Sequence, residues 1–179
     1  MGNIIMKRKW RTAVITLSDK GYAGEREDKS GPLIREIVEE QGYEVAEMVL
    51  LPDEQKLIEE KLIQLCDEEK MDLILTTGGT GFSPRDCTPE ATMAVAQKNA
   101  PGIAEAMRYE SLKITPRAML SRGASVIRGE TLIINLPGSP KAVKENLECI
   151  LTSLPHGLEI MKGLTGECGS AGKSHTEEK

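Results

Sequence analysis

Hydrophobic residues follow two alternating patterns along the chain. Short runs of consecutive apolar residues are typical of strands buried on both faces of a parallel sheet. Between them, apolar residues recur every three or four positions, as in helices that cover a sheet on one side. The alternation predicts an α/β fold with a largely parallel sheet. The expected strands are residues 12–17, 45–51, 72–76, 118–120, 125–127 and 131–135.

Several residues are typical of helix N-termini and predict where the helices begin. Ser30, Thr88 and Ser139 are expected to cap helices, each closely followed by a proline that suits the first helical turn. The expected helices are residues 30–41, 54–70, 88–97, 101–112, a long region from 139 to about 154, and 157–161.

Length and composition predict one domain. The 179 residues contain only 3% aromatics, so a core must be built from aliphatic side chains. We expect residues 1–9 to be a flexible N-terminal extension, 10–162 a single domain, and 163–179 a disordered tail, because the tail is rich in glycine, serine, threonine and charge.

Charge and cysteine spacing exclude several classes of protein. The net charge of −5 argues against nucleic-acid binding, which normally needs a basic patch. No apolar run approaches the length of a membrane span, and the N-terminus lacks the apolar core of a signal peptide, so we expect no membrane partner. The four cysteines lack zinc-site spacing and are typical of reduced thiols, which predicts a cytoplasmic protein.

The most informative stretch is a short apolar strand that runs into a loop of glycines and threonines, residues 72–81. Glycine allows positive φ and close approach to a ligand, so successive N–H groups can point into one concavity. In open α/β sheets, such loops at the carboxyl ends of strands bind phosphorylated ligands. Arg85 and Asp86 close the loop with a cation and a carboxylate. The alternative is a purely structural glycine turn.

Three other loops also follow predicted strands and could share this edge of the sheet. They contain Asp19, Asp53 and residues 135–141. The last of these ends at a helix N-terminus, which favours phosphate. Asp53 and Asp86 could together bind Mg²⁺ with a nucleotide, since this cation prefers carboxylate oxygens.

Each of these features also has a structural alternative. Asp53 could cap the following helix, Asp86 could form an Asx-turn, and residues 135–141 could be an ordinary strand-to-helix connection. Four arginines could be solvated charges or could bring positive charge near the crevice, as an anionic substrate requires. They are Arg108, Arg117, Arg122 and Arg128.

Several ordered motifs resemble the molybdopterin adenylyltransferase family, which includes Mog proteins, their MoaB paralogues and the G domains of gephyrin. The resemblance covers about residues 10–162. The motifs are residues 76–81 (TTGGTG), 84–92 (PRDCTPEAT), 51–54 (LPDE), 110–116 (ESLKITP), 118–122 (AMLSR) and 133–140 (IINLPGSP).

The resemblance implies a three-layer α/β sandwich that forms a homotrimer. It also implies transfer of AMP from Mg²⁺-bound ATP to molybdopterin, with release of pyrophosphate, and a possible MoeA-like partner that inserts molybdenum. The residues implied as catalytic and metal-binding are Asp53 and Asp86. Those implied in substrate binding are Thr77, Gly78, Gly79, Thr80, Gly81, Ser121, Arg122, Asn135, Pro137, Gly138 and Ser139.

Three other functions stay open at this point. The chain could be a non-catalytic MoaB-type paralogue that binds pterin, or a trimeric scaffold for other proteins. It could also use the same fold for another nucleotide chemistry, such as pyrophosphate-bond hydrolysis.

Overall fold

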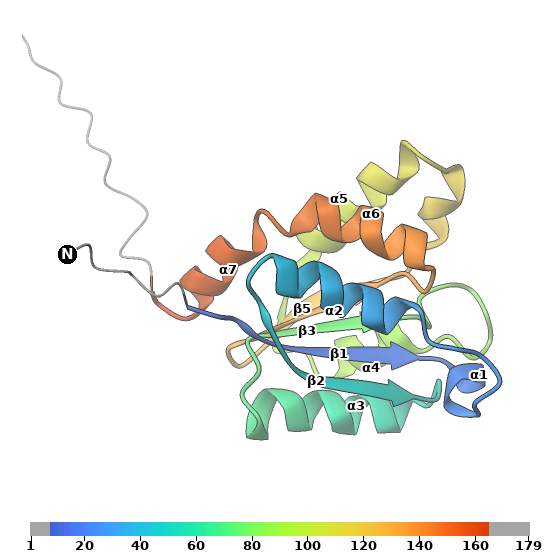
Figure 1. Ribbon diagram of the computed structural model, residues 1–179, viewed down its shortest axis with the longest axis horizontal. Coiled ribbons are helices and arrows are strands. Elements are labelled where there is room, and N and C mark those ends of the chain that lie inside the picture. The colour runs from blue at the N-terminus through green and yellow to red at the C-terminus, as the bar shows by residue number, and fades with distance from the viewer. Residues whose placement is uncertain (1–7, 165–179) are drawn as a thin grey trace, which may run out of the picture.

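The computed structural model describes residues 8–164, and most of the predicted N-terminal extension and tail lie outside them. A six-stranded sheet lies between two layers of helices, with strand order β2-β1-β3-β6-β5-β4 (Figure 1). The strands are β1 (Arg11–Leu17), β2 (Glu44–Leu51), β3 (Leu73–Thr77), β4 (Lys98–Asn99), β5 (Ser125–Arg128) and β6 (Thr131–Leu136). Neighbours among β2, β1, β3 and β6 are parallel, whereas β5 and β4 join antiparallel at one edge. The predicted α/β sandwich with a mostly parallel sheet is confirmed.

The helices connect these strands over both faces of the sheet. They are α1 (Asp19–Tyr22), α2 (Ser30–Glu40), α3 (Gln55–Ile63), which continues into the π-helical turn η1 (Gln64–Glu68), α4 (Thr88–Ala94), α5 (Pro101–Leu112), the 3₁₀ helix η2 (Pro116–Leu120), α6 (Pro140–Ile150) and α7 (Leu154–Met161).

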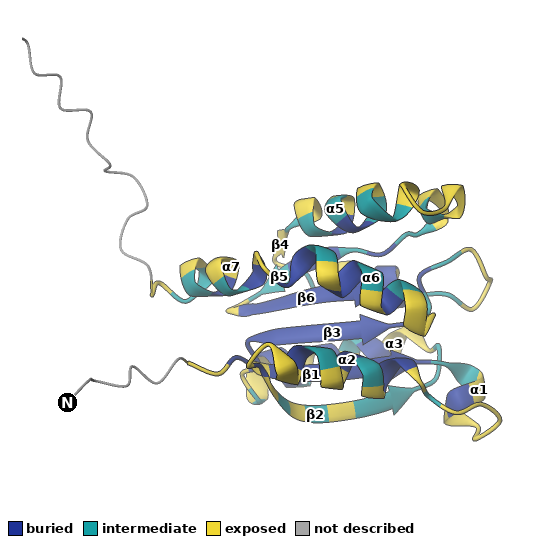
Figure 2. Cartoon of the chain, turned by 45° about the horizontal axis from the view of Figure 1, so that its top comes forward, coloured by how far each residue is buried: buried dark blue, intermediate teal, exposed yellow. Residues whose placement is uncertain are grey.

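Two hydrophobic cores lie on opposite faces of the sheet. Successive strand residues point to opposite faces, so in β1 Val14 joins one core while Ala13 and Ile15 join the other. Helices α2, α5, α6 and α7 cover the first core, and α3, η1 and α4 cover the second. The central strands β3 and β6 are buried along their whole length (Figure 2). The sheet is therefore a rigid platform for the loops at its ends.

One predicted strand is wrong. Residues 118–120 belong to the 3₁₀ helix η2. Pro116 fixes φ at its start, and the Thr115 hydroxyl accepts a hydrogen bond from the Arg117 N–H. The short apolar run there packs beside α5 and does not join the sheet.

Two of the three predicted helix caps are also wrong. Ser139 caps α6 as expected, since its hydroxyl accepts from the Ala142 N–H at 3.3 Å. Asp28, rather than Ser30, accepts the first N–H groups of α2. The Ser30 hydroxyl instead donates to the Gly138 carbonyl at 2.8 Å and so ties two loops together. Thr88 likewise does not cap α4.

The strand order opens a crevice between the carboxyl ends of β1 and β3. The chain leaving β1 passes over one face of the sheet through α2, and the chain leaving β3 passes over the other face through α4. Loops leaving β1 and β3 therefore diverge, which in open α/β sheets leaves a ligand-binding crevice. The base of this crevice is tightly packed, because a Cβ on Gly78 would overlap the carbonyl oxygen of Leu17.

We predict that Gly78→Ala is strongly destabilising. Gly78 has φ +96°, so alanine would be strained as well as in collision with Leu17, and the loss should be about 2 kcal/mol or more. Gly102→Ala in α5 is the matched control, because its Cβ would meet no atom within 4 Å. Denaturant unfolding measures both variants. Equal stability of Gly78→Ala and the natural chain would contradict this packing.

Candidate functional site

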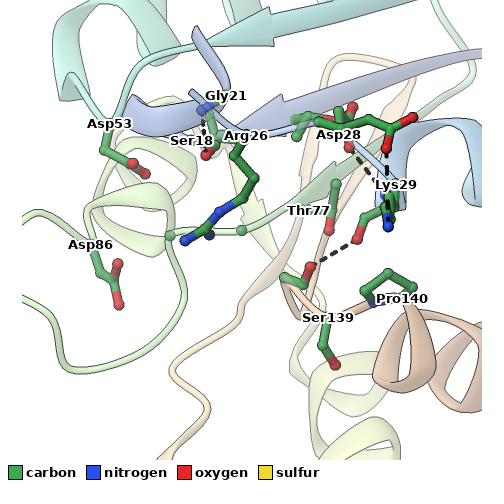
Figure 3. Close-up of a pocket in the computed structure, with 17 residues that line it drawn as sticks. Ser18, Gly21, Arg26, Asp28, Lys29, Asp53, Thr77, Asp86, Ser139 and Pro140 are labelled. Atoms are coloured by element: carbon green, nitrogen blue, oxygen red, sulfur yellow. Dashed lines mark hydrogen bonds and ion pairs between the residues drawn. The ribbon is translucent and has the colours of Figure 1, made fainter. Parts of the chain in front are cut away.

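A cavity of about 710 Å³ lies at the carboxyl ends of β1 and β3. Its walls come from the end of β1, residues 26–30 before and at the start of α2, Asp53 after β2, the glycine loop after β3 with Asp86, and the start of α6 (Figure 3). Segments far apart in the sequence thus meet here because the parallel strands all end at this edge.

Asp53 is held by a reciprocal pair of hydrogen bonds with Asp19. The Asp53 N–H donates to the Asp19 carboxylate and the Asp19 N–H donates to Asp53 Oδ2, both at 3.0 Å. The other oxygen, Asp53 Oδ1, is buried and has no hydrogen-bond partner within residues 8–164. Asp53 does not cap α3, whose N-cap position is Glu54. An oriented carboxylate with one uncommitted oxygen is suited to bind a cation.

Burial raises the pKa of Asp53, and the negative charges of Asp19 and Asp86 raise it further. Asp19 shows the opposite shift, because the Arg85 guanidinium that hydrogen-bonds to it lowers its pKa. The cavity therefore holds a carboxylate at Asp53 whose charge is poorly compensated by the protein.

Asp86 reaches the same cavity from the loop after β3 (Figure 3). Its Oδ2 accepts from the Ser83 N–H at 3.1 Å, upstream in the loop. A Cβ on Gly81 would lie 2.9 Å from this oxygen, so glycine leaves room for the carboxylate. The structure thus brings together the two predicted acids on separate connecting segments.

No group of three or more His, Cys, Asp or Glu side chains within the described chain is arranged to hold a metal ion. Two carboxylates are nevertheless enough for Mg²⁺, which usually keeps waters and takes further oxygens from substrate phosphates. The orphaned, buried oxygen of Asp53 fits such an ion.

In the glycine loop, the carbonyl groups are hydrogen-bonded within the described residues, whereas the N–H groups of residues 79–81 are not. Each carbonyl of residues 78–81 accepts a hydrogen bond from the protein. Thr88 supplies two through its hydroxyl and N–H (2.9 and 3.1 Å), and Arg122 supplies two through its N–H and Nε (2.9 and 2.7 Å). The N–H groups of residues 79–81 donate to no acceptor found within residues 8–164. Hydrogen-bonded carbonyls and uncommitted N–H groups are what an anion-binding loop requires, and of these three residues Gly79 lines the cavity.

The predicted substrate-binding residues fall into three groups. Those that line the main cavity with both aspartates are Thr77, Gly78, Gly79, Gly138 and Ser139. Those that line a second cavity of about 210 Å³, between α5, η2 and α6, are Ser121, Asn135 and Pro137. Those that line neither cavity are Thr80, Gly81 and Arg122.

Three residues of these groups brace the site from outside the main cavity. Arg122 also donates to the Asp86 carbonyl at 3.0 Å and pairs with Glu90. Asn135 is buried, and its amide donates to two threonine hydroxyls. Pro137 accepts from the Thr77 hydroxyl at 2.7 Å, which joins the loops after β3 and β6.

The other arginines lie in different parts of the molecule. Arg85 donates twice to Asp19 (2.9 and 3.1 Å) and once to Glu54 (2.7 Å), and so ties the glycine loop to the loops after β1 and β2. Arg108 and Arg117 line the second cavity. Arg128 pairs with Asp67 next to the start of β6, at the opposite end of the sheet from the main cavity.

Sequence reasoning missed Arg26, which lines the main cavity. It lies in a polar segment, residues 18–29, that we expected to be a loop throughout, although residues 19–22 form α1. The signal available was the position of this segment after a predicted buried strand.

Comparison with known proteins assigns a family. Residues 13–156 match the model of the family described as "Probable molybdopterin binding domain". The chain belongs to this molybdopterin-binding family.

Curated relatives in this family match most of the chain. The molybdopterin adenylyltransferase of Helicobacter pylori (strain J99) is 45% identical over 84% of this chain and 86% of its own length. That of Escherichia coli (strain K12) is 41% identical over 86% of each chain.

Solved structures agree with the fold. The molybdopterin biosynthesis enzyme MoaB of Thermus thermophilus superposes with a TM-score of 0.82 at 49% identity, covering 86% of this chain and 97% of its own.

None of the helices that the structure describes is long and apolar enough to cross a membrane.

We predict that Asp53→Asn stabilises the metal-free protein at neutral pH. Because the pKa of Asp53 is raised in the folded state, its favourable contribution is complete below the ordinary value of 3.8 and is lost as the pH rises through the raised pKa. The neutral amide avoids this loss. Thermal melting with a chelator, across a pH series, should give a higher Tm for Asp53→Asn at neutral pH and a smaller difference in acid. A lower Tm at neutral pH would contradict the assignment.

Proposed function

We propose that this protein is a molybdopterin adenylyltransferase of molybdenum cofactor biosynthesis. It transfers AMP from Mg²⁺-bound ATP to the terminal phosphate of molybdopterin and releases pyrophosphate. The relatives that carry this name are 41–45% identical over most of both chains. The observation that carries the proposal is the glycine loop with uncommitted N–H groups beside Asp53 and Asp86.

The cavity suits two phosphorylated ligands. Its volume of about 710 Å³ lies in the usual range for small-molecule sites, about 300–1,000 Å³. Helix α6 has 11 residues and presents its N-terminus, with Ser139, at the wall opposite the aspartates (Figure 3). Pro140 has no N–H and Ser139 accepts that of Ala142, so the helix contributes mainly the positive end of its dipole. This helix end and the glycine loop give two surfaces that favour anions in one cavity.

Magnesium would be held by Asp53 and Asp86. The bound ion would neutralise charge on the phosphates. The two carboxylates come from different loops. Arg85, next to Asp86, hydrogen-bonds to Asp19 and to Glu54, which follows Asp53, so both loops are held in place before any ligand arrives. Such preorganisation limits the rearrangement needed at the moment of reaction.

The chemistry needs no protein nucleophile. An oxygen of the molybdopterin phosphate attacks the α-phosphorus of ATP, and the bond from that phosphorus to the pyrophosphate oxygen breaks. Cys87 lies next to Asp86, but burial raises the pKa of its thiol, so it is not activated. The chain's task is to hold two anions in line and to stabilise the developing charge with backbone N–H groups.

We predict that Asp53→Asn and Asp86→Asn each lower adenylyl transfer by about 100-fold or more while the protein stays folded. Mass detection of AMP-bearing pterin and pyrophosphate release measure the reaction. Asp67→Asn is the matched control, because Asp67 pairs with Arg128 away from the cavity. Near-natural rates for both site variants would contradict the roles proposed here.

The same assay separates the other functions. A non-catalytic MoaB-type paralogue would bind pterin but form no adenylylated product. A trimeric scaffold would form no adenylylated product either. Nucleotide turnover without pterin would indicate pyrophosphate-bond hydrolysis instead. The cytoplasmic location, which rests on the cysteine pattern, and the MoeA-like partner, which rests on the resemblance, remain part of the proposal.

The proposed homotrimer has a candidate contact surface. The end of α5 and η2 project from the body of the molecule (Figure 1). Five large apolar side chains are exposed there, a density that in soluble proteins usually marks an interface. They are Tyr109, Leu112, Ile114, Met119 and Leu120.

We predict that Met119→Glu dissociates the trimer, because Met119 is 63% exposed and a buried glutamate would lack a partner in the interface. Leu57→Glu on α3, across the sheet, is the control and should leave the assembly intact. Analytical ultracentrifugation measures both. A natural chain that sediments as a monomer, or a Met119→Glu protein that stays trimeric, would contradict this surface.

A further inference from the structure

A cavity that receives a polyphosphate beside two aspartates needs positive charge, and most arginines near it are committed elsewhere. Arg85 uses three N–H donors on Asp19 and Glu54. Arg122 uses its donors on two carbonyls and on Glu90. Both guanidinium groups stabilise the loops that form the site, and neither residue lines the cavity.

Arg26 is the exception. It lines the cavity, and Figure 3 shows its side chain extending from its loop into the space on the side of Asp53 and Asp86. Its side chain makes no hydrogen bond or ion pair with any residue from 8 to 164. The only other lysine or arginine in the described lining, Lys29, lies 4.0 Å from Glu27 and is 71% exposed. Arg26 is therefore the guanidinium that the described part of the protein leaves uncommitted in this cavity.

The loop that carries Arg26 is anchored on both sides of it. On one side, the Arg26 N–H donates to the Lys20 carbonyl at 3.2 Å. On the other, Asp28 accepts from the Thr16 hydroxyl of β1 at 2.6 Å and from two N–H groups of α2 at 3.0 Å. The backbone position is thus defined while the side chain remains available, which limits the entropy lost when it binds a ligand.

We propose that Arg26 binds the phosphate chain of the nucleotide and the pyrophosphate that leaves it. The inference rests on the proposed function and names a residue for it. The four acidic residues that line the cavity, Glu27, Asp28, Asp53 and Asp86, repel a polyanion. A planar guanidinium forms paired, charge-assisted hydrogen bonds with phosphate oxygens. Arg26 extends on the side of Asp53 and Asp86 (Figure 3), where a polyphosphate sharing a cation with them would lie. The more remote α6 N-terminus is left for the pterin phosphate.

Calorimetric titration with pyrophosphate and Mg²⁺ tests this without any turnover. Arg26→Gln should weaken binding about tenfold or more, because it removes a charge-assisted contact. Arg26→Lys should be intermediate, since it keeps the charge and loses the fork. The matched control is Arg35→Gln, because Arg35 pairs with Glu39 on the exposed surface of α2 and lies outside the cavity lining. It should bind as the natural chain does.

Steady-state kinetics give a second readout. Arg26→Gln should raise the KM for Mg²⁺-bound ATP and leave the KM for molybdopterin unchanged. Unchanged pyrophosphate affinity in Arg26→Gln, or a raised KM for molybdopterin alone, would overturn the inference. A natural chain that binds pyrophosphate through Arg26 but never forms adenylylated pterin would overturn the proposed function while leaving this anion site in place.

Discussion

The position of β1 between two parallel neighbours is the constraint on which this site depends. β1 pairs with β2 on one side and β3 on the other, so the carboxyl ends of all three meet at one edge. Its apolar residues fill both cores, which prevents the strand from shifting by one residue without exposing them. The loops that carry Asp19, Asp53 and Asp86 therefore converge through the pairing of the sheet, and not through any affinity between the acids, which repel each other.

That repulsion is managed locally. Asp19 and Asp53 exchange backbone hydrogen bonds, and Arg85 offsets the charge of Asp19 and of Glu54. Within residues 8–164, Asp53 forms no ion pair of its own, and its raised pKa records the imbalance. A protein selected only for stability would have paired or removed this charge. The unmatched carboxylate is an arrangement suited to a ligand that brings positive charge, as a metal-bound nucleotide does.

The sequence was sufficient for five of the six strands of the sheet, but not for the short edge strand β4 or for the details of the connections. Continuous apolar runs identify β1, β3 and β6 because those strands are buried on both faces, and the glycine loop could be identified by its composition. The strand prediction for residues 118–120 was wrong because three apolar residues after Pro116 fit a short strand as well as a 3₁₀ turn. Ser30 and Thr88 misled because a hydroxyl near a helix start can bond to a distant loop carbonyl, and nothing local reveals that partner. The role of Arg26 could not be inferred from spacing because it depends on which other arginines are already paired.

The hydroxyl and guanidinium donors around the site share one purpose. Loops that leave a parallel sheet carry carbonyl groups that no neighbouring strand can pair, and buried carbonyls need donors. Thr77, Thr88 and Arg122 satisfy those of Pro137 and of residues 78–81. Because side chains satisfy the acceptors, the backbone of the glycine loop is fixed with its carbonyls held by the protein, and its N–H groups remain for a ligand. The threonine and arginine side chains that fix the conformation of the loop are thus the same ones that leave its N–H groups for anions. A substitution of Thr88 or Arg122 would therefore alter ligand binding, although neither side chain needs to contact the ligand.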